Sequence, residues 1–95
     1  MAHYRLSLRA DQDLFDIFRY GIKTFGLVQA ESYQIDLTRC FDLLAENPCL
    51  GRPADIIAPG LRRHEHARHV ILYEIEADGV LILAVLHGRR LLHLF

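Results

Sequence analysis

The chain contains only two cysteines, Cys40 and Cys49, among its 95 residues. Two thiols do not make a disulfide framework, so we expect a reduced protein in the cytoplasm. The N-terminal segment lacks the apolar stretch of a secretory signal, and no apolar run reaches the roughly 18 residues that a membrane span requires. We therefore expect no membrane partner. The glycines stand singly as turn or cap residues, which argues against a phosphate-binding glycine loop.

The sequence also lacks a large excess of either charge. It has 11 Lys and Arg against 12 Asp and Glu, and a net charge of −1 gives no overall attraction to nucleic acid or membrane. A hydrophobic fraction of 52% is ordinary for a folded protein, and we expect one domain over residues 1–95. Residues 58–95 hold five arginines against four acids, together with five of the six histidines. The C-terminal part is therefore electropositive, and more so in acid.

Apolar spacing predicts one strand followed by two helices. Tyr4–Leu8 alternates apolar and polar residues, which is typical of a strand with one buried face. Apolar residues recur at helical spacing over Ala10–Phe25 and again over Val28–Glu46. Gly26 suits the end of the first helix. Because this junction is so short, we expect the two helices to form an antiparallel hairpin.

The second half of the chain predicts a loop and three strands. Residues 48–60 contain three prolines and two glycines, which is typical of a loop. Strands are expected at Leu61–His66, His69–Glu76 and Val80–His87, the last two joined by a hairpin turn that ends in Gly79. The last strand is apolar throughout, as in central strands covered on both faces. The helical hairpin can cover one face, and the C-terminal tail or a partner would have to cover the other.

These elements give the order β-α-α-β-β-β. The predicted fold class is α+β, with a helical hairpin packed on a mostly antiparallel four-stranded sheet.

Cationic residues flank the predicted strands. If the strands pair as a meander, those at the two ends of the region can gather on one sheet and form a surface for an anion or an acidic partner. The alternative is that each is a solvated strand end. The candidate residues of this target-binding surface are Arg62, Arg63, His64, His87, Arg89 and Arg90.

The closely spaced histidines resemble a metal cluster only at first sight. His64 and His66 share a strand face, whereas we expect His69, beyond a turn, to have the opposite parity. No further ligand has the spacing to complete a tetrahedral site, so we expect no metal and no cofactor. Cys40 lies on an apolar helical stripe, where a thiol is inert.

An ordered series of motifs resembles a known family. The series runs NP-x-LGRP, PGLRR, H-V-I-x-Y and VLHGRR, and the similarity covers about Tyr4–Arg90. On these motifs the chain resembles the RelE/ParE toxin superfamily of bacterial toxin–antitoxin systems, and within it the ParE branch. The resemblance implies the fold derived above and a toxin neutralised by a ParD-like antitoxin. ParE relatives inhibit DNA gyrase, whereas RelE relatives cut messenger RNA on the ribosome.

The resemblance also implies where the antitoxin binds. Its C-terminal segment would lay an apolar helix along the helical hairpin, where several apolar residues fall off the main buried stripes and would otherwise be exposed. DNA would be contacted only indirectly, through the antitoxin or gyrase. The candidate antitoxin-binding residues are Phe15, Phe18, Ile22, Val28, Ile35 and Leu43.

Residue chemistry favours the gyrase branch. RNA cleavage needs a base, an acid and cations for the phosphorane. Arg63 and Arg89 match basic positions of RelE-like enzymes, but the expected central arginine falls at Val70 and no tyrosine follows Tyr73. We therefore predict no catalytic residues. A RelE-like mRNA endonuclease, with His87 as acid or base, stays open as the alternative, as does an inactive toxin kept as a corepressor.

Overall fold

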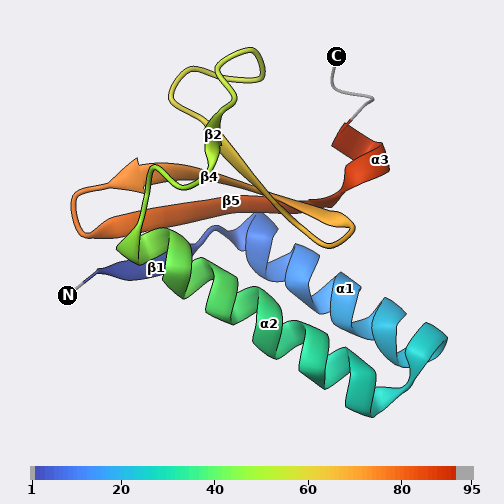
Figure 1. The fold of residues 1–95 in the computed structure, drawn as a ribbon. Helices are drawn as coiled ribbons and strands as arrows, with labels where there is room; N and C mark the ends of the chain where they lie inside the picture. The colour runs from blue at the N-terminus through green and yellow to red at the C-terminus, as the bar shows by residue number, and fades with distance from the viewer. Residues whose placement is uncertain (1, 92–95) are drawn as a thin grey trace.

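The computed structural model describes residues 2–91. Its elements, in chain order, are β1 (His3–Leu6), α1 (Leu8–Phe25), α2 (Leu27–Glu46), β2 (Arg52–Pro53), β3 (Arg62–His66), β4 (His69–Glu76), β5 (Gly79–His87) and α3 (Gly88–Leu91). The strands form one sheet in the order β1-β5-β4-β3-β2, with β1 parallel to β5 and the other neighbours antiparallel. Helices α1 and α2 lie together against one side of it (Figure 1). The α+β class and the helical hairpin on a mostly antiparallel sheet are thereby confirmed.

The sheet has five strands, one more than the sequence predicts. The additional strand, β2, consists of Arg52 and Pro53 and pairs with the start of β3 at the sheet edge. A two-residue edge strand that contains proline is too short to show the alternation of apolar and polar residues by which a strand is predicted. The expected loop over residues 48–60 is therefore interrupted by this pairing.

Helix α1 begins two residues earlier than predicted. The Ser7 side chain caps it by accepting a hydrogen bond from the Ala10 N–H at 2.9 Å. Leu8, expected on the buried face of the first strand, is instead the first helical residue and is 93% exposed. The Ser7 hydroxyl also donates to the Leu83 carbonyl at 2.8 Å, which fixes the start of α1 on β5.

Side chains of α1 complete the edge of β5 where β1 stops. The pairing of β1 with β5 ends at Leu6 opposite Ile82. Beyond it, the Val85 N–H donates to the Asp13 carboxylate at 3.0 Å, and Arg9 Nε donates to the same carboxylate at 3.0 Å. Asp13 is buried, so these partners compensate a carboxylate that would otherwise be costly to remove from water.

The hairpin turns at a single glycine. Gly26 has φ 91°, donates its N–H to the Ile22 carbonyl and accepts from the Ala30 N–H, both at 3.1 Å. Gly26 therefore caps both helices, and its predicted place at the end of the first is confirmed. A Cβ on Gly21 would lie 3.2 Å from the Ala30 Cβ, so the helices approach closely there. No helix within residues 2–91 combines the length and apolarity that a membrane crossing requires.

The hydrophobic core has one layer on each face of the sheet. Phe41 and Tyr73 are the largest fully buried side chains between the hairpin and the sheet. On the far face, the segment from Ala54 to Leu61 packs over Val70, Leu72, Ala84 and Leu86. The central place of β5 is confirmed, but the loop after β2 covers the far face, where we expected the tail or a partner. Tail residues 92–95 lie outside the described part of the chain.

Tyr73 anchors the loop that follows α2. Its hydroxyl donates to the Pro48 carbonyl at 2.7 Å and accepts from the Gly51 N–H at 2.9 Å. Two residues of the NP-x-LGRP motif, Pro48 and Gly51, are thus held by one buried phenol, which needs these partners because it is removed from water.

Candidate functional site

The residues expected at the target-binding surface separate into two groups. The first, on β3, comprises Arg62, Arg63 and His64, and the second, at the end of β5 and on α3, comprises His87, Arg89 and Arg90. Strand β4 lies between β3 and β5. Arg62 and Arg63 are adjacent in a strand and therefore point to opposite faces of the sheet. The expectation of a single converged cationic surface is wrong.

The β3 arginines bind parts of their own chain. Arg62 Nη2 donates to the carbonyls of Gly51 at 2.6 Å and Cys49 at 3.2 Å. Arg63 pairs with Glu65 at 2.7 Å. The Arg62 contacts hold the loop after α2 against β3, a structural role that sequence reasoning missed because the partners are backbone carbonyls.

Glu65 is shared by two arginines on the far face. Arg52 reaches its Oε1 at 2.5 Å and Arg63 at 2.7 Å. Partial burial acts to raise the pKa of Glu65, but the hydrogen bonds from Arg63 and Arg52 outweigh it and hold that pKa below its usual value. The charge of Arg63 is therefore largely engaged inside the molecule.

Three histidines instead form a row across one end of the sheet. The β3–β4 turn places His66 opposite His69, and β5 places His87 opposite His69. Rings of His69 and His87 have centroids 5.8 Å apart. The predicted opposite parity of His69 is wrong, because a turn of only two residues, with Ala67 at φ 53°, keeps directly opposed residues on one face. Within residues 2–91, no three His, Cys, Asp or Glu side chains are placed to hold a metal ion.

Tyr33 joins this row to α2. Its hydroxyl lies 2.6 Å from His69 Nδ1, and its ring centroid lies 5.6 Å from that of His66. Burial, followed by the neighbouring His87 and His66, lowers the pKa of His69. Burial raises the pKa of the Tyr33 hydroxyl, although nearby Arg68 opposes this. Near neutral pH the pair is therefore uncharged, and the phenol can donate to the imidazole.

We expect this pair to make folding acid-sensitive. Because the pKa of His69 is lower in the folded than in the unfolded chain, the unfolded chain binds more protons, so the free energy of unfolding falls as pH drops below about 6.5. Urea denaturation at pH 5 to 7 should show this slope, and His69→Gln should flatten it. His3→Gln, an exposed histidine on β1, is the control. An unchanged slope in His69→Gln would refute the assignment.

A groove opens beside the histidine row, beneath the hairpin. It has a volume of about 530 Å³ and receives Tyr20 and Phe25 from α1, Tyr33 from α2, and Arg68 and Arg90 from the sheet end. Most of its lining is aromatic or apolar, but Asp13, Asp16 and Gln29 also line it beside the two arginines. The sequence pointed to Arg90 and His87 but not to the aromatic wall, because its side chains come from two different helices.

Helix α3 carries the exposed cations of this end. Arg89 and Arg90 follow Gly88, the first residue after β5, and are exposed. Neither forms an ion pair with any other residue of the described range. The Arg89 N–H donates to His87 Nδ1 at 3.2 Å, which ties the start of α3 to the histidine row. These guanidinium groups are therefore available to an external acceptor.

The apolar residues expected to bind the antitoxin do lie on the surface of the hairpin. Val28 is 82% exposed, and Phe15, Ile35 and Leu43 are each at least half exposed. Ile22 is exposed to a lesser degree and Phe18 is partly buried. We call this set the apolar helical surface: Phe15, Phe18, Ile22, Val28, Ile35 and Leu43.

Comparison with known proteins identifies the family. The family model described as "ParE toxin of type II toxin-antitoxin system, parDE" matches residues 4–92. This chain belongs to the ParE toxin family. "Toxin ParE1" of Caulobacter vibrioides is 38% identical over 87 residues, covering 92% of this chain and 90% of that protein. "Toxin ParE1" of Mycobacterium tuberculosis strain H37Rv is 34% identical over 89 residues, covering 93% and 91%.

A solved structure has the same fold. A chain from the "Chromosomal ParDE TA system from P. aeruginosa" superposes with a TM-score of 0.77 at 21% identity, covering 92% of this chain and 96% of that chain. At this identity the similarity concerns the fold. The membership in the ParE family that the motifs suggested is confirmed by the family model and the curated relatives.

The groups that an RNA-cleaving relative would use are only partly brought together in this ParE-family chain. Val70, at the position of the expected central arginine, is 3% exposed and packs under the far-face loop. Arg63 lies opposite Leu72 on that far face, whereas His87 lies on the helix-facing side with His69. Arg63 and the candidate acid–base group are thus on opposite faces, whereas Arg89, the other candidate cation, lies beside His87. Cys40 is buried, which raises the pKa of its thiol.

Proposed function

We propose that this protein is the toxin of a type II toxin–antitoxin pair. A ParD-like antitoxin neutralises it by covering the apolar helical surface, and the free toxin inhibits DNA gyrase by protein–protein contact. Membership of the ParE family supports the pairing. DNA is contacted only through the antitoxin or gyrase.

The observation that carries the antitoxin half is the exposure of the apolar helical surface. Val28 at 82% and Ile35 at 50% exposure lie two turns apart on α2, with Phe15 and Ile22 on α1. Several large apolar side chains exposed on one helical hairpin are typical of a protein interaction site. Two antiparallel helices offer a partner helix a groove for residues at i, i+3 and i+4 spacing.

The target half rests on the cations of α3. Arg89 and Arg90 present guanidinium donors suited to carboxylates or phosphates, and His87 lies beside them. Arg62, Arg63 and His64 are secondary in this proposal because the two arginines are bound to their own chain. An inhibitor that acts by contact needs no proton-transfer set.

We expect Val28→Asp/Ile35→Asp to abolish neutralisation while toxicity persists. Docking would bury two carboxylates without partners, which is costly, so affinity for the antitoxin should fall at least about a hundredfold. Cells co-expressing this variant with the product of the adjacent antitoxin gene should stop growing, and calorimetry should show the lost affinity.

Thr24→Asp/Gln29→Asp is the matched control. It adds the same two charges at exposed positions of the same hairpin, outside the apolar helical surface. Neutralisation should be retained there. Full neutralisation of Val28→Asp/Ile35→Asp would show that the antitoxin docks elsewhere.

A further inference from the structure

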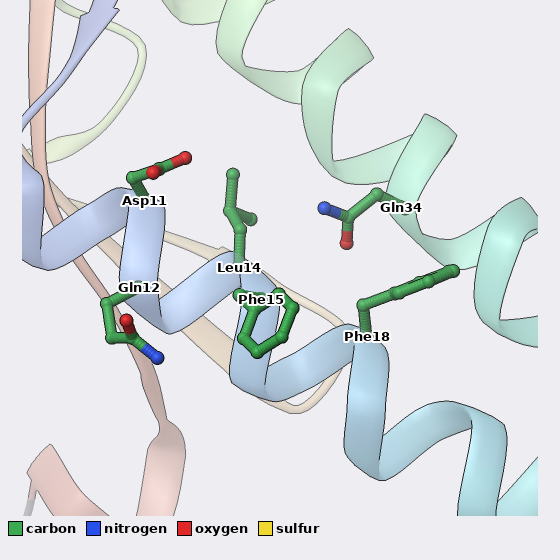
Figure 2. A pocket seen from close by; sticks show the side chains of 6 residues that line it. All are labelled: Asp11, Gln12, Leu14, Phe15, Phe18 and Gln34. Carbon is green, nitrogen blue, oxygen red and sulfur yellow. The ribbon is translucent and has the colours of Figure 1, made fainter.

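A second groove lies on the outer side of the hairpin, between α1 and α2. Its volume is about 500 Å³, and its lining comprises Asp11, Gln12, Leu14, Phe15, Phe18 and Gln34. Figure 2 shows Phe18 and Gln34 extending toward one another across the gap between the two helices, with Asp11 and Leu14 at one end. The groove adjoins the apolar helical surface through Phe15 and Phe18.

The floor of this groove contains a polar atom with no partner. Gln34 Oε1 is buried and accepts no hydrogen bond from the described residues. The exposed Asp11 carboxylate forms no ion pair or side-chain hydrogen bond with the rest of the described chain. The lining includes no Lys or Arg. The groove therefore offers two oxygen acceptors beside an apolar wall, and a buried acceptor left unpaired is unfavourable.

A side chain that fills this groove must pack against the apolar wall and also donate hydrogen bonds to the two acceptors. A purely apolar side chain would leave Gln34 Oε1 without a partner, and an acidic one would face Asp11 at close range. Arginine and lysine combine an apolar stem with a cationic donor at its end. The Phe15 ring already accepts such a cation, since the Arg19 guanidinium carbon lies 5.8 Å from its centroid.

We propose that this groove takes one arginine or lysine side chain of the antitoxin. Its methylene stem lies on Leu14, Phe15 and Phe18, and its cationic head donates to Gln34 Oε1 and the Asp11 carboxylate. This inference rests on the proposed antitoxin docking and adds the residue type that the antitoxin must present. Gln34 is then a specificity residue, because a partner without the basic side chain leaves a buried acceptor unpaired.

The test measures how tightly each toxin variant binds the antitoxin encoded by the adjacent gene. Each variant competes with wild-type toxin for the antitoxin, starting from the purified wild-type complex. Gln34→Leu keeps the side-chain size but removes the acceptor, and should weaken binding about tenfold. Gln34→Glu, which can only accept, should bind at least as tightly as wild type. Asp11→Asn should weaken binding several-fold. Gln29→Leu, an exposed glutamine of the same helix, should bind like wild type.

A scan of the antitoxin identifies the partner residue. One Arg→Met or Lys→Met substitution in the antitoxin should weaken its binding to wild-type toxin. The same substitution should have little further effect on binding to the Gln34→Leu toxin, because two residues in direct contact are energetically coupled. Wild-type affinity for Gln34→Leu, loss of affinity for Gln34→Glu, or absence of a coupled basic residue would each overturn the inference. If Val28→Asp/Ile35→Asp still weakens binding in those cases, the proposed function stands and only the basic anchor fails.

Discussion

Gly51→Ala should destabilise the fold by about 3 kcal/mol or more, because overpacking costs about 1–3 kcal/mol and unpairing buried polar groups costs a similar amount again. A Cβ at this buried position would clash with the Tyr73 hydroxyl and lie 2.6 Å from the Arg63 carbonyl oxygen. The phenol cannot retreat without breaking its bonds to Pro48 and to the Gly51 N–H. Urea denaturation of the purified protein measures the loss.

Two further variants separate this clash from a general effect of losing glycine. Gly88→Ala places a Cβ 3.4 Å from the Arg68 carbonyl, an ordinary contact, and should change stability little. Tyr73→Phe removes one of the two oxygens that the new methyl meets, the other being the Arg63 carbonyl oxygen. The double variant Gly51→Ala/Tyr73→Phe should therefore be less destabilised than the sum of its single substitutions. Simple additivity would show that the clash is not with the phenol.

The role of Gly51 also shows how far the sequence predicts the fold. Strands with many apolar residues at a clear period, such as His69–Glu76, are predicted with their observed bounds, and Gly26 identifies the hairpin turn. The contacts that hold residues 48–60 against the sheet join a glycine N–H, backbone carbonyls and a phenol 22 residues away. Such contacts produce no periodic pattern in the sequence, so the sequence predicts only a loop for that segment.

The candidate site was only partly predictable for a related reason. The exposed apolar residues of the hairpin follow from helical spacing, because a residue off the buried stripe must face outward. The positions of the cationic residues on the sheet depend on strand register, and register depends on turn geometry. The two-residue turn at Ala67 and Arg68 aligned His66, His69 and His87, and the pairing of β2 with β3 brought Arg52 to the Glu65 that Arg63 also binds. The composition shows which charged residues this region has, but not the face of the sheet on which each one lies.

Arg89→Glu/Arg90→Glu should abolish toxicity without unfolding the protein. Both side chains are exposed and unpaired within the described residues, so their reversal costs the fold little. At an interface, loss of a hydrogen-bonded charge pair costs about 2–5 kcal/mol, so two reversals should lower target affinity at least about a hundredfold. Induction of wild type should give filamentous cells, DNA breaks and a DNA-damage response, and the variant should give none of these.

The matched control is Arg19→Glu/Lys23→Glu, which makes the same change in net charge at exposed positions of α1. It should remain toxic, because those cations lie on the hairpin and away from α3. Arg62→Glu/Arg63→Glu should instead lower stability, since those guanidinium groups bind the Gly51 carbonyl and Glu65. Undiminished toxicity of Arg89→Glu/Arg90→Glu would exclude α3 as the target surface. Transcript cleavage before DNA breakage in wild-type cells would favour the endonuclease alternative, and absence of any phenotype would favour an inactive toxin retained as a corepressor.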